Sequence, residues 1–320
     1  MADTLFTWGK DNITTLLTTT IENRRGEIQD AIFNDRPTIK FLKEKNRVRV
    51  DGGASIISHL MYAANSTVAW YEGYDTVDTT PQEGFTAAQF KWKECAGSVS
   101  VSNREETIQN VGKSQVFNIV TAKQKQLEES LKNELNNSLY RASPTAKQMT
   151  SLVTMIDATS TIGDINSGTN SWWQSYVVAS GSFAAQGRSD MLDVWNTLIV
   201  RGSGDNPADF IVTTPAVHRF YEGSLVPQIR YQGTSMGNAS FQNLMFKTAP
   251  VVFDNACTAG VAYFLNSKHL ELVVNSNNDF KLTEWVKPAN QTAKVAQLVV
   301  ALELSSNNRR RLAKMTGITA

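Results

Sequence analysis

The sequence predicts an α+β protein in which an N-terminal arm and a β-hairpin arm precede a long helix and a compact α/β region. Three patterns support this fold class: strand-like alternation around a turn-rich segment in residues 47–103, an amphipathic helical pattern in residues 112–141, and short apolar runs between helices in residues 145–282. An isolated hairpin is marginally stable in water, so the hairpin arm must lie on another surface. We expect that surface to belong to another copy of the chain.

The composition indicates a folded protein without a strongly charged surface. The 320 residues are enough for two domains, or for one large domain with appendages. The 31 basic and 30 acidic residues give a net charge of +1, which argues against a dedicated nucleic-acid reader but not against a protein that encloses nucleic acid. Two cysteines, Cys95 and Cys257, favour a reduced setting, although a single bridge between them is open.

The sequence carries no targeting or membrane signal that we can recognise. It opens with Met1, Ala2 and Asp3, without the basic and apolar regions of a signal peptide. No apolar run approaches the roughly 20 residues that a membrane span needs, so we expect no membrane partner.

Residues 1–46 are predicted to form the N-terminal arm. This segment is polar and rich in threonine, with apolar residues at a spacing that predicts one amphipathic helix. The helix should end before Pro37, because the residue before a proline is disfavoured in a helix.

Residues 47–103 are predicted to form the hairpin arm. Alternation in residues 47–50 predicts a strand, and Asp51, Gly52 and Gly53 predict a hairpin turn, because both central residues of such a turn need positive φ. A second strand is expected in residues 56–62, followed by a turn-rich tip at 74–84. The chain then returns through residues 85–92 and 98–101.

Residues 112–141 give the clearest helical pattern. Glu128 and Lys132 form a favourable i,i+4 pair on its flank, and Ser143-Pro144 ends it. The apolar stripe consists of Val116, Val120, Leu127, Leu131, Leu135 and Leu139. A lone helix of this length after a β arm suggests a structural strut.

The compact α/β region and the C-terminal tail contain the remaining elements. Ser189 is expected to cap a helix that runs to Gly202, and Pro215 to begin another. The tail strand in residues 294–304 should be buried on both faces, because Val299-Val300 breaks its alternation. Further strands are expected in residues 209–213, 246–253, 261–265, 270–274 and 280–286.

No catalytic, cofactor or metal motif emerges from the sequence. The segment 111–114 resembles the end of a phosphate-binding loop, but Thr107 stands where the first glycine is required. His59, His218 and His269 share no metal-type spacing. Residues 202–204 are not a nucleophile elbow. We therefore predict a protein that is not an enzyme.

Several segments, taken in order, resemble the major capsid proteins of tailed bacteriophages, the Hong Kong 97-like capsid fold family. The resemblance extends over essentially the whole chain and depends on the order of the segments rather than on one motif. The matching segments are residues 74–84 with 90–93, 215–221 with 227–230, 244–254 with 263–266, 291–295, and 308–311.

The resemblance implies a domain organisation. Residues 1–46 would be the N-terminal arm, 47–103 the E-loop, 104–147 and 283–320 the peripheral (P) domain with its spine helix and sheet, and 148–282 the axial (A) domain. It also implies a structural protein that self-assembles into the hexamers and pentamers of an icosahedral head enclosing double-stranded DNA. The protein would be found in the virion and assembled in the cytoplasm of the bacterial host.

The sequence departs from some members of that family. Only about 46 residues precede the E-loop, which leaves no room for a large fused scaffolding domain, so scaffolding would come from a separate protein or not be needed. Portal and decoration proteins are further expected partners. Some members cross-link through a lysine and an asparagine, for which Lys91 or Lys93 and Asn290, Asn307 or Asn308 are candidates, but solvated lysines are the default interpretation.

Two groups of residues are candidate contact sites. The first lies on the E-loop and consists of Tyr74, Asp75, Asp78, Glu83, Lys91 and Lys93. A cation site at the three acidic residues is less favoured than pairing with a neighbouring subunit, because hard cations need five or more oxygen ligands. The second group is the basic run Arg309, Arg310, Arg311 and Lys314. In a strand, Arg309 and Arg311 would share a face, and the run would contact packaged DNA non-specifically or form ion pairs between subunits.

Two other functions remain open at this point. An encapsulin-like compartment would keep the fold and enclose enzymes instead of DNA. A soluble hydrolase or binding protein with a β arm would need a nucleophile, metal or phosphate site that the sequence does not show.

Overall fold

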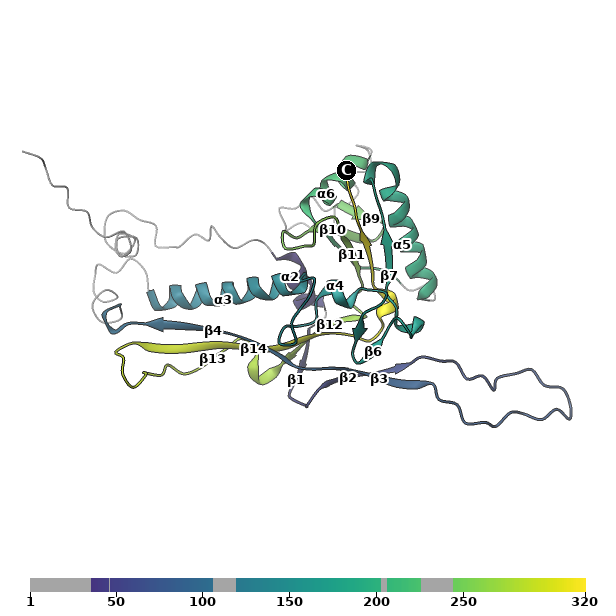
Figure 1. The fold of residues 1–320 in the computed structure, drawn as a ribbon, viewed down its shortest axis with the longest axis horizontal. Helices are drawn as coiled ribbons and strands as arrows, with labels where there is room; N and C mark the ends of the chain where they lie inside the picture. Colours follow the sequence, from purple (N-terminus) through teal and green to yellow (C-terminus); the bar gives the residue numbers. More distant parts are fainter. Residues whose placement is uncertain (1–35, 46, 106–118, 203–205, 226–243) are drawn as a thin grey trace, which may run out of the picture. The chain divides into compact units, whose positions relative to one another are not determined.

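The computed structural model describes residues 36–45, 47–105, 119–202, 206–225 and 244–320, which fall into two compact units (Figure 1). The first unit includes residues 95–133 and 280–300, and the second includes 34–94, 134–279 and 301–320. The predicted N-terminal helix and the predicted start of the long helix lie outside the described residues.

The first unit combines strands with part of the long helix. Strand β13 (Lys281–Leu282) pairs antiparallel with the first half of β14 (Lys294–Ser306), and β4 (Lys93–Val101) also pairs with β14. A Cβ at Gly97 would lie 2.5 Å from Leu127 Cδ1, so the helix packs directly on β4 at this glycine. The strand predicted in residues 280–286 is shorter than expected, because only Lys281 and Leu282 form β13. One further bridge pairs Val286 with Val295.

The long helix is present as α3 (Ile119–Leu139). Leu131, Leu135 and Leu139 of its predicted stripe are buried. The Lys132 Nζ lies 2.6 Å from Glu128 Oε1, which confirms the predicted i,i+4 pair. The helix ends before Ser143-Pro144, as expected.

A six-stranded sheet forms the core of the second unit. Its strand order is β7 (Tyr176–Ala179), β15 (Ala313–Thr316), β11 (Ala262–Leu265), β8 (Phe210–Thr213), β10 (Ala249–Phe253) and β9 (Leu244–Phe246). Helices α5 (Arg188–Arg201) and α6 (Pro215–Ser224) contribute Val194, Leu198 and Tyr221 to the same buried cluster. Five of these six strands come from residues 148–282, and β15 comes from the C-terminal segment.

Local signals predicted several of these elements correctly. All four residues of β8 are buried, Pro215 is the first residue of α6, and Thr214 caps that helix through its side chain. The predicted cap at Ser189 is wrong, because a π-helical turn (Phe183–Gly187) leads directly into α5 and the Ser189 hydroxyl donates to Gln186 O.

One predicted strand is two strands. The run in residues 246–253 divides into β9 and β10, which pair antiparallel through Ala249 and Phe246. Lys247 adopts a φ of 52° in the turn between them. The turn was not predicted, because neither Lys247 nor Thr248 carries a strong turn signal.

The predicted hairpin turn at residues 51–53 is also wrong. Strand β1 (Arg47–Val50) pairs parallel with β12 (Leu270–Asn275) and not with the strand that follows it. Arg47 and Arg49 both form ion pairs with Asp279, which follows a short 3₁₀ helix (Ser276–Asn278). Long-range pairing therefore overrides the local Asp-Gly signal. Strand β12 in turn pairs antiparallel with the second half of β14.

Helix α2 (Pro37–Lys45) was not predicted. Pro37 begins this helix, where a proline is well tolerated because the first helical N–H has no partner within the helix. Leu42 is fully buried, and the ring of Phe41 stacks on Phe210 at 4.2 Å between centroids.

A buried carboxylate links α2 to the rest of the second unit. Asp254 is 1% exposed and accepts hydrogen bonds from Thr38 Oγ1 at 3.0 Å, Asn136 Nδ2 at 3.0 Å and the Ala256 amide at 2.9 Å. Tyr140 OH lies 3.4 Å from the same carboxylate. These donors satisfy the buried oxygen atoms of Asp254, so the group joins α2, the last turns of α3 and the segment after β10.

Glu303 is a second buried acid, and it generates a prediction about pH. Its Oε1 accepts from the backbone amides of Thr150 at 2.7 Å and Leu304 at 2.9 Å, and burial raises its pKa to about 7. A folded-state pKa above the unfolded value means that ionisation opposes folding. Stability should therefore decline as pH rises from the unfolded pKa of about 4.3 to about 7.

Glu303→Gln should remove this component of the pH dependence. The amide keeps the accepting oxygen but cannot ionise, so the variant should gain on the order of 3 kcal/mol relative to the parent between pH 4 and pH 8. Denaturant unfolding of both proteins across this range measures the difference. A constant difference between the two curves would contradict the prediction.

Candidate subunit-contact arm

The hairpin arm is formed by β2 (Ile56–Met61) and β3 (Phe85–Phe90), paired antiparallel from Ile56–Phe90 to Met61–Phe85 (Figure 1). We use "the arm" for residues 56–90. Because side chains alternate along a strand, the two faces of the arm differ. Leu60, Ala88 and Phe90 are buried on one face, which confirms strands where the sequence predicted them.

The other face of the arm exposes apolar side chains. Met61 and Phe85 lie directly opposite each other and are 76% and 80% exposed. The connection between the strands exposes more, and Trp70 and Tyr74 are completely accessible. The other exposed apolar residues of the arm are Ile57, Tyr62, Val68, Tyr71 and Val77. Exposed apolar side chains that gather in one segment in this way indicate a candidate contact site.

Local hydrogen bonds shape the connection even though it has no regular secondary structure. Ser66 Oγ donates to Gln82 Oε1 at 2.7 Å and joins its two sides. Asp75 Oδ2 accepts from the Glu72 amide at 3.0 Å, and Asp78 Oδ1 accepts from the Thr80 amide at 2.9 Å. The hydrogen bonds from Thr80 lower the pKa of Asp78, so this tip carboxylate is charged at neutral pH.

The predicted contact residues of the arm differ in their surroundings. Tyr74, Asp75, Asp78 and Glu83 are exposed in the connection, and Lys91 is exposed just beyond β3. Lys93 is half-buried instead, and its Nζ donates to Ala146 O at 2.6 Å. Contact of the exposed residues with a neighbouring subunit remains a prediction, whereas Lys93 helps to hold the base of the arm.

The basic run has a different geometry from the one predicted. Residues Arg309–Arg311 form a 3₁₀ turn instead of a strand, and both Arg309 and Arg311 are buried, at 0% and 2% exposure. The expectation that they face DNA or a neighbouring subunit is wrong. Arg310 is exposed and is still able to play either role.

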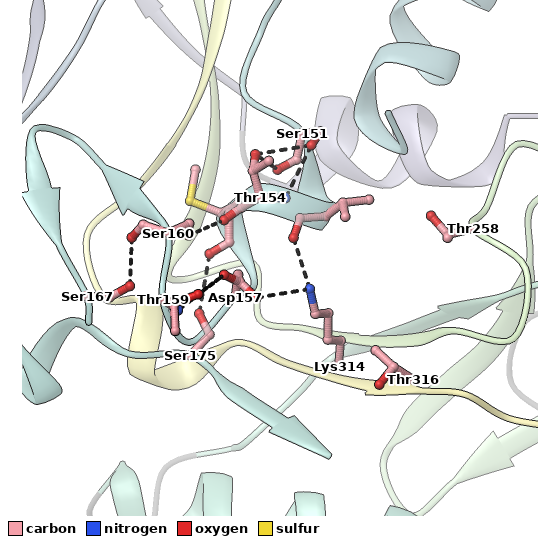
Figure 2. A network of polar contacts seen from close by, with 12 residues as sticks. Ser151, Thr154, Asp157, Thr159, Ser160, Ser167, Ser175, Thr258, Lys314 and Thr316 are labelled. Atoms are coloured by element: carbon pink, nitrogen blue, oxygen red, sulfur yellow. Dashed lines mark hydrogen bonds and ion pairs between the residues drawn. The ribbon is translucent and has the colours of Figure 1, made fainter. Parts of the chain in front are cut away.

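The buried basic residues satisfy backbone carbonyls. Arg309 donates to Met155 O at the end of α4 (Leu152–Met155), and Arg311 donates to Leu198 O at 2.7 Å near the end of α5. Lys314 is 8% exposed and donates to Val153 O at 3.0 Å, with Asp157 3.7 Å away (Figure 2). The last carbonyls of a helix have no partner within it, which explains why cations lie there.

Close approach to a glycine accommodates Arg311. A Cβ at Gly202 would lie 0.9 Å from Arg311 Nη1, so only a glycine leaves space for the guanidinium at this position. The predicted end of α5 at Gly202 is confirmed, but the reason is packing against the arginine, since the φ of Gly202 is −118°.

The described residues contain no group of three or more His, Cys, Asp or Glu side chains that could hold a metal ion. His218 packs edge-on against Phe253, and burial lowers its pKa. None of the described helices is both long and apolar enough to cross a membrane. The arm is therefore the feature of the described structure that most clearly suggests a function.

No protein-family model and no curated protein sequence matches the chain. Solved structures do match it over almost its whole length, and the predicted capsid fold is confirmed by them.

The matches include two capsids and an encapsulin. The cyanophage A-1(L) capsid has a TM-score of 0.68 at 16% identity, covering 94% of this chain and 98% of that one. The capsid of a native GTA particle has a TM-score of 0.69 at 11% identity, covering 93% and 96%. The holo-SrpI encapsulin complex from Synechococcus elongatus has a TM-score of 0.57 at 9% identity, covering 97% and 96%. At these identities the likeness is one of fold.

The exposure of the arm generates a prediction about stability. Trp70→Ser should change the free energy of unfolding by less than about 0.5 kcal/mol, because the side chain has no partner in the folded subunit among the described residues. It should nevertheless weaken self-association, measured by analytical ultracentrifugation.

Val200→Ser is the matched control, since Val200 is also exposed, at 82%, but lies on α5 and outside the arm. Equal losses of self-association in both variants would show that exposed apolar area in general, and not the arm, drives association.

Proposed function

We propose that this chain is a major capsid protein, a structural subunit that self-assembles into the hexamers and pentamers of an icosahedral phage head enclosing double-stranded DNA. The observation that carries the proposal is the arm, on which Met61, Phe85, Trp70 and Tyr74 are largely or completely exposed to solvent. The shared fold with phage capsids supports it. The role is structural rather than catalytic.

The arm offers two kinds of contact to a neighbouring copy. The side chains of Met61, Phe85 and Trp70 supply apolar area, at about 25 cal/mol for each Å² removed from water. The outer edge of β2 has backbone donors and acceptors that a neighbouring strand can pair with. A closed shell repeats each contact many times, so individual contacts need only modest strength.

The four-part division into N-terminal arm (1–46), E-loop (47–103), P domain (104–147 and 283–320) and A domain (148–282) is part of this proposal. Contact with the packaged DNA would be independent of its sequence, as the net charge of +1 suggests. Of the four basic residues proposed for that contact, Arg310 is the one that remains suitable.

Separate scaffolding, portal and decoration proteins are the further partners that we propose. Assembly would take place in the bacterial cytoplasm.

An encapsulin-like compartment is the alternative function, favoured by the match to the SrpI encapsulin complex. Both functions use the same shell and differ in what the shell contains. The phage capsid is preferred because the E-loop segment at residues 74–84 resembles the phage group.

Electron microscopy of the purified chain, expressed alone and with its neighbouring genes, tests both functions. We expect closed shells or capsomer rings, and nuclease-protected DNA inside shells made with the neighbouring genes. Shells that contain protein cargo and no DNA would support the encapsulin alternative. A monomer under both conditions would contradict the proposal.

Deletion of residues 75–84 tests the role of the arm in assembly. The deleted residues are exposed except for the half-buried Gly84, so the subunit should remain folded while closed particles are lost. Circular dichroism measures folding and microscopy measures assembly. Normal shells formed by the deletion variant would show that the tip of the arm is not needed.

A further inference from the structure

The base of the arm contacts a loop in the same unit. We call residues 157–173 "the bracket". The amide of Gln89 on β3 donates to Gly163 O at 3.1 Å. Tyr62, the residue after β2, stacks on Trp172 with ring centroids 5.1 Å apart. The bracket therefore contacts the arm on β3 and just beyond β2.

A tight turn brings the bracket against β3. Strands β5 (Thr161–Ile162) and β6 (Ile165–Asn166) form a short hairpin whose two turn residues, Gly163 and Asp164, have φ values of 62° and 63°. Such a turn requires positive φ at both positions. A Cβ at Gly163 would lie 2.7 Å from Ala88 Cβ, so the contact with the arm depends on a residue without a side chain.

Arg309 holds the bracket from its other side. Its Nη2 donates to Asp157 O and to Ser160 Oγ, each at 2.9 Å, while its Nε donates to Met155 O at 2.8 Å. The guanidinium also lies over the ring of Trp173, 5.8 Å from its centroid, and Trp173 Nε1 donates to Ile162 O at 3.0 Å. One side chain thus orders the start of the bracket and supports its hairpin.

Hydroxyl groups extend this network along the bracket (Figure 2). Ser160 Oγ donates to Thr154 O, and Ser167 Oγ donates to Ser160 O, both at 2.7 Å. Ser175 Oγ donates to Arg309 O at 3.0 Å and closes the network on the arginine itself. The bracket is in this way held by a hydrogen bond to its own Ser160 carbonyl and by a hydrogen bond to the Thr154 carbonyl of α4.

The charge of Arg309 matters for this arrangement. A buried guanidinium is costly unless its donors are satisfied, and its acceptors here are carbonyl and hydroxyl oxygens of a loop rather than a directly bonded carboxylate. Burial lowers its pKa to about 10, so it stays charged at neutral pH. A planar fork with five donors reaches carbonyls that lie in several directions, whereas a lysine offers three donors from a single nitrogen.

We propose that Arg309 is a positioning residue for subunit assembly: acting through the bracket, it sets the direction in which the arm leaves its unit. The assembly part of this inference rests on the proposed function. The positioning part does not, because it concerns contacts within one subunit.

Hydrogen exchange at the arm tests the positioning. Arg309→Lys keeps the charge but not the fork, and Trp172→Ser removes the stack on Tyr62 from a half-buried position. Both variants should increase the exchange rate of the Gln89 amide about tenfold, while amides of β8 and β11 keep their rates. Arg310→Lys is the matched control and should leave all of these rates unchanged.

Two outcomes would overturn the inference. Parent-like exchange at Gln89 in both variants would show that the bracket does not hold the arm. Faster exchange with a normal yield of regular shells would show that the direction of the arm does not matter for assembly. If the parent chain forms no shells, the proposed function fails, and the exchange measurement still decides whether Arg309 positions the arm.

Discussion

A two-stranded hairpin has no second layer, and this constraint explains much of the structure. Its inner face can be buried only where it meets the rest of its unit, as Leu60 and Phe90 are, and the outer face stays in water. The chain compensates at the base of the arm, where Trp92 Nε1 donates to Gly53 O at 2.9 Å and Lys93 bonds Ala146 O. What remains exposed is not covered by the described residues and is available to another molecule.

Buried cations connect distant parts of the second unit. Arg309, Arg311 and Lys314 are close in sequence, yet they bond carbonyls of α4, the bracket and α5. Each carbonyl lies at or near the end of a helix or in a loop, where the backbone has no partner of its own. The C-terminal segment thereby holds α4, the bracket and α5 together. Hydrogen bonds from its buried cations stabilise loops that have little regular secondary structure.

Local sequence patterns predicted some of these elements, and they missed others for physical reasons that can be named. Pro215 after a polar cap and the apolar run of β8 depend on neighbours in sequence, so they could be recognised. Burial of Arg309 depends on carbonyls more than 140 residues away, which no local pattern reveals. The hairpin of the bracket was not predicted, although the sequence contains a signal for it: Gly163-Asp164 between two isoleucines is a typical hairpin turn.

The acidic tip of the arm has a consequence for the unassembled subunit. Strands with open edges are prone to pair with identical strands, and exposed aromatic residues increase that hazard. Asp75, Asp78 and Glu83 give every arm the same negative tip, so two arms that approach tip to tip repel each other. Like charge thus discourages fibrous aggregation of free subunits, while a docking surface of different chemistry on a neighbour is approached without that penalty.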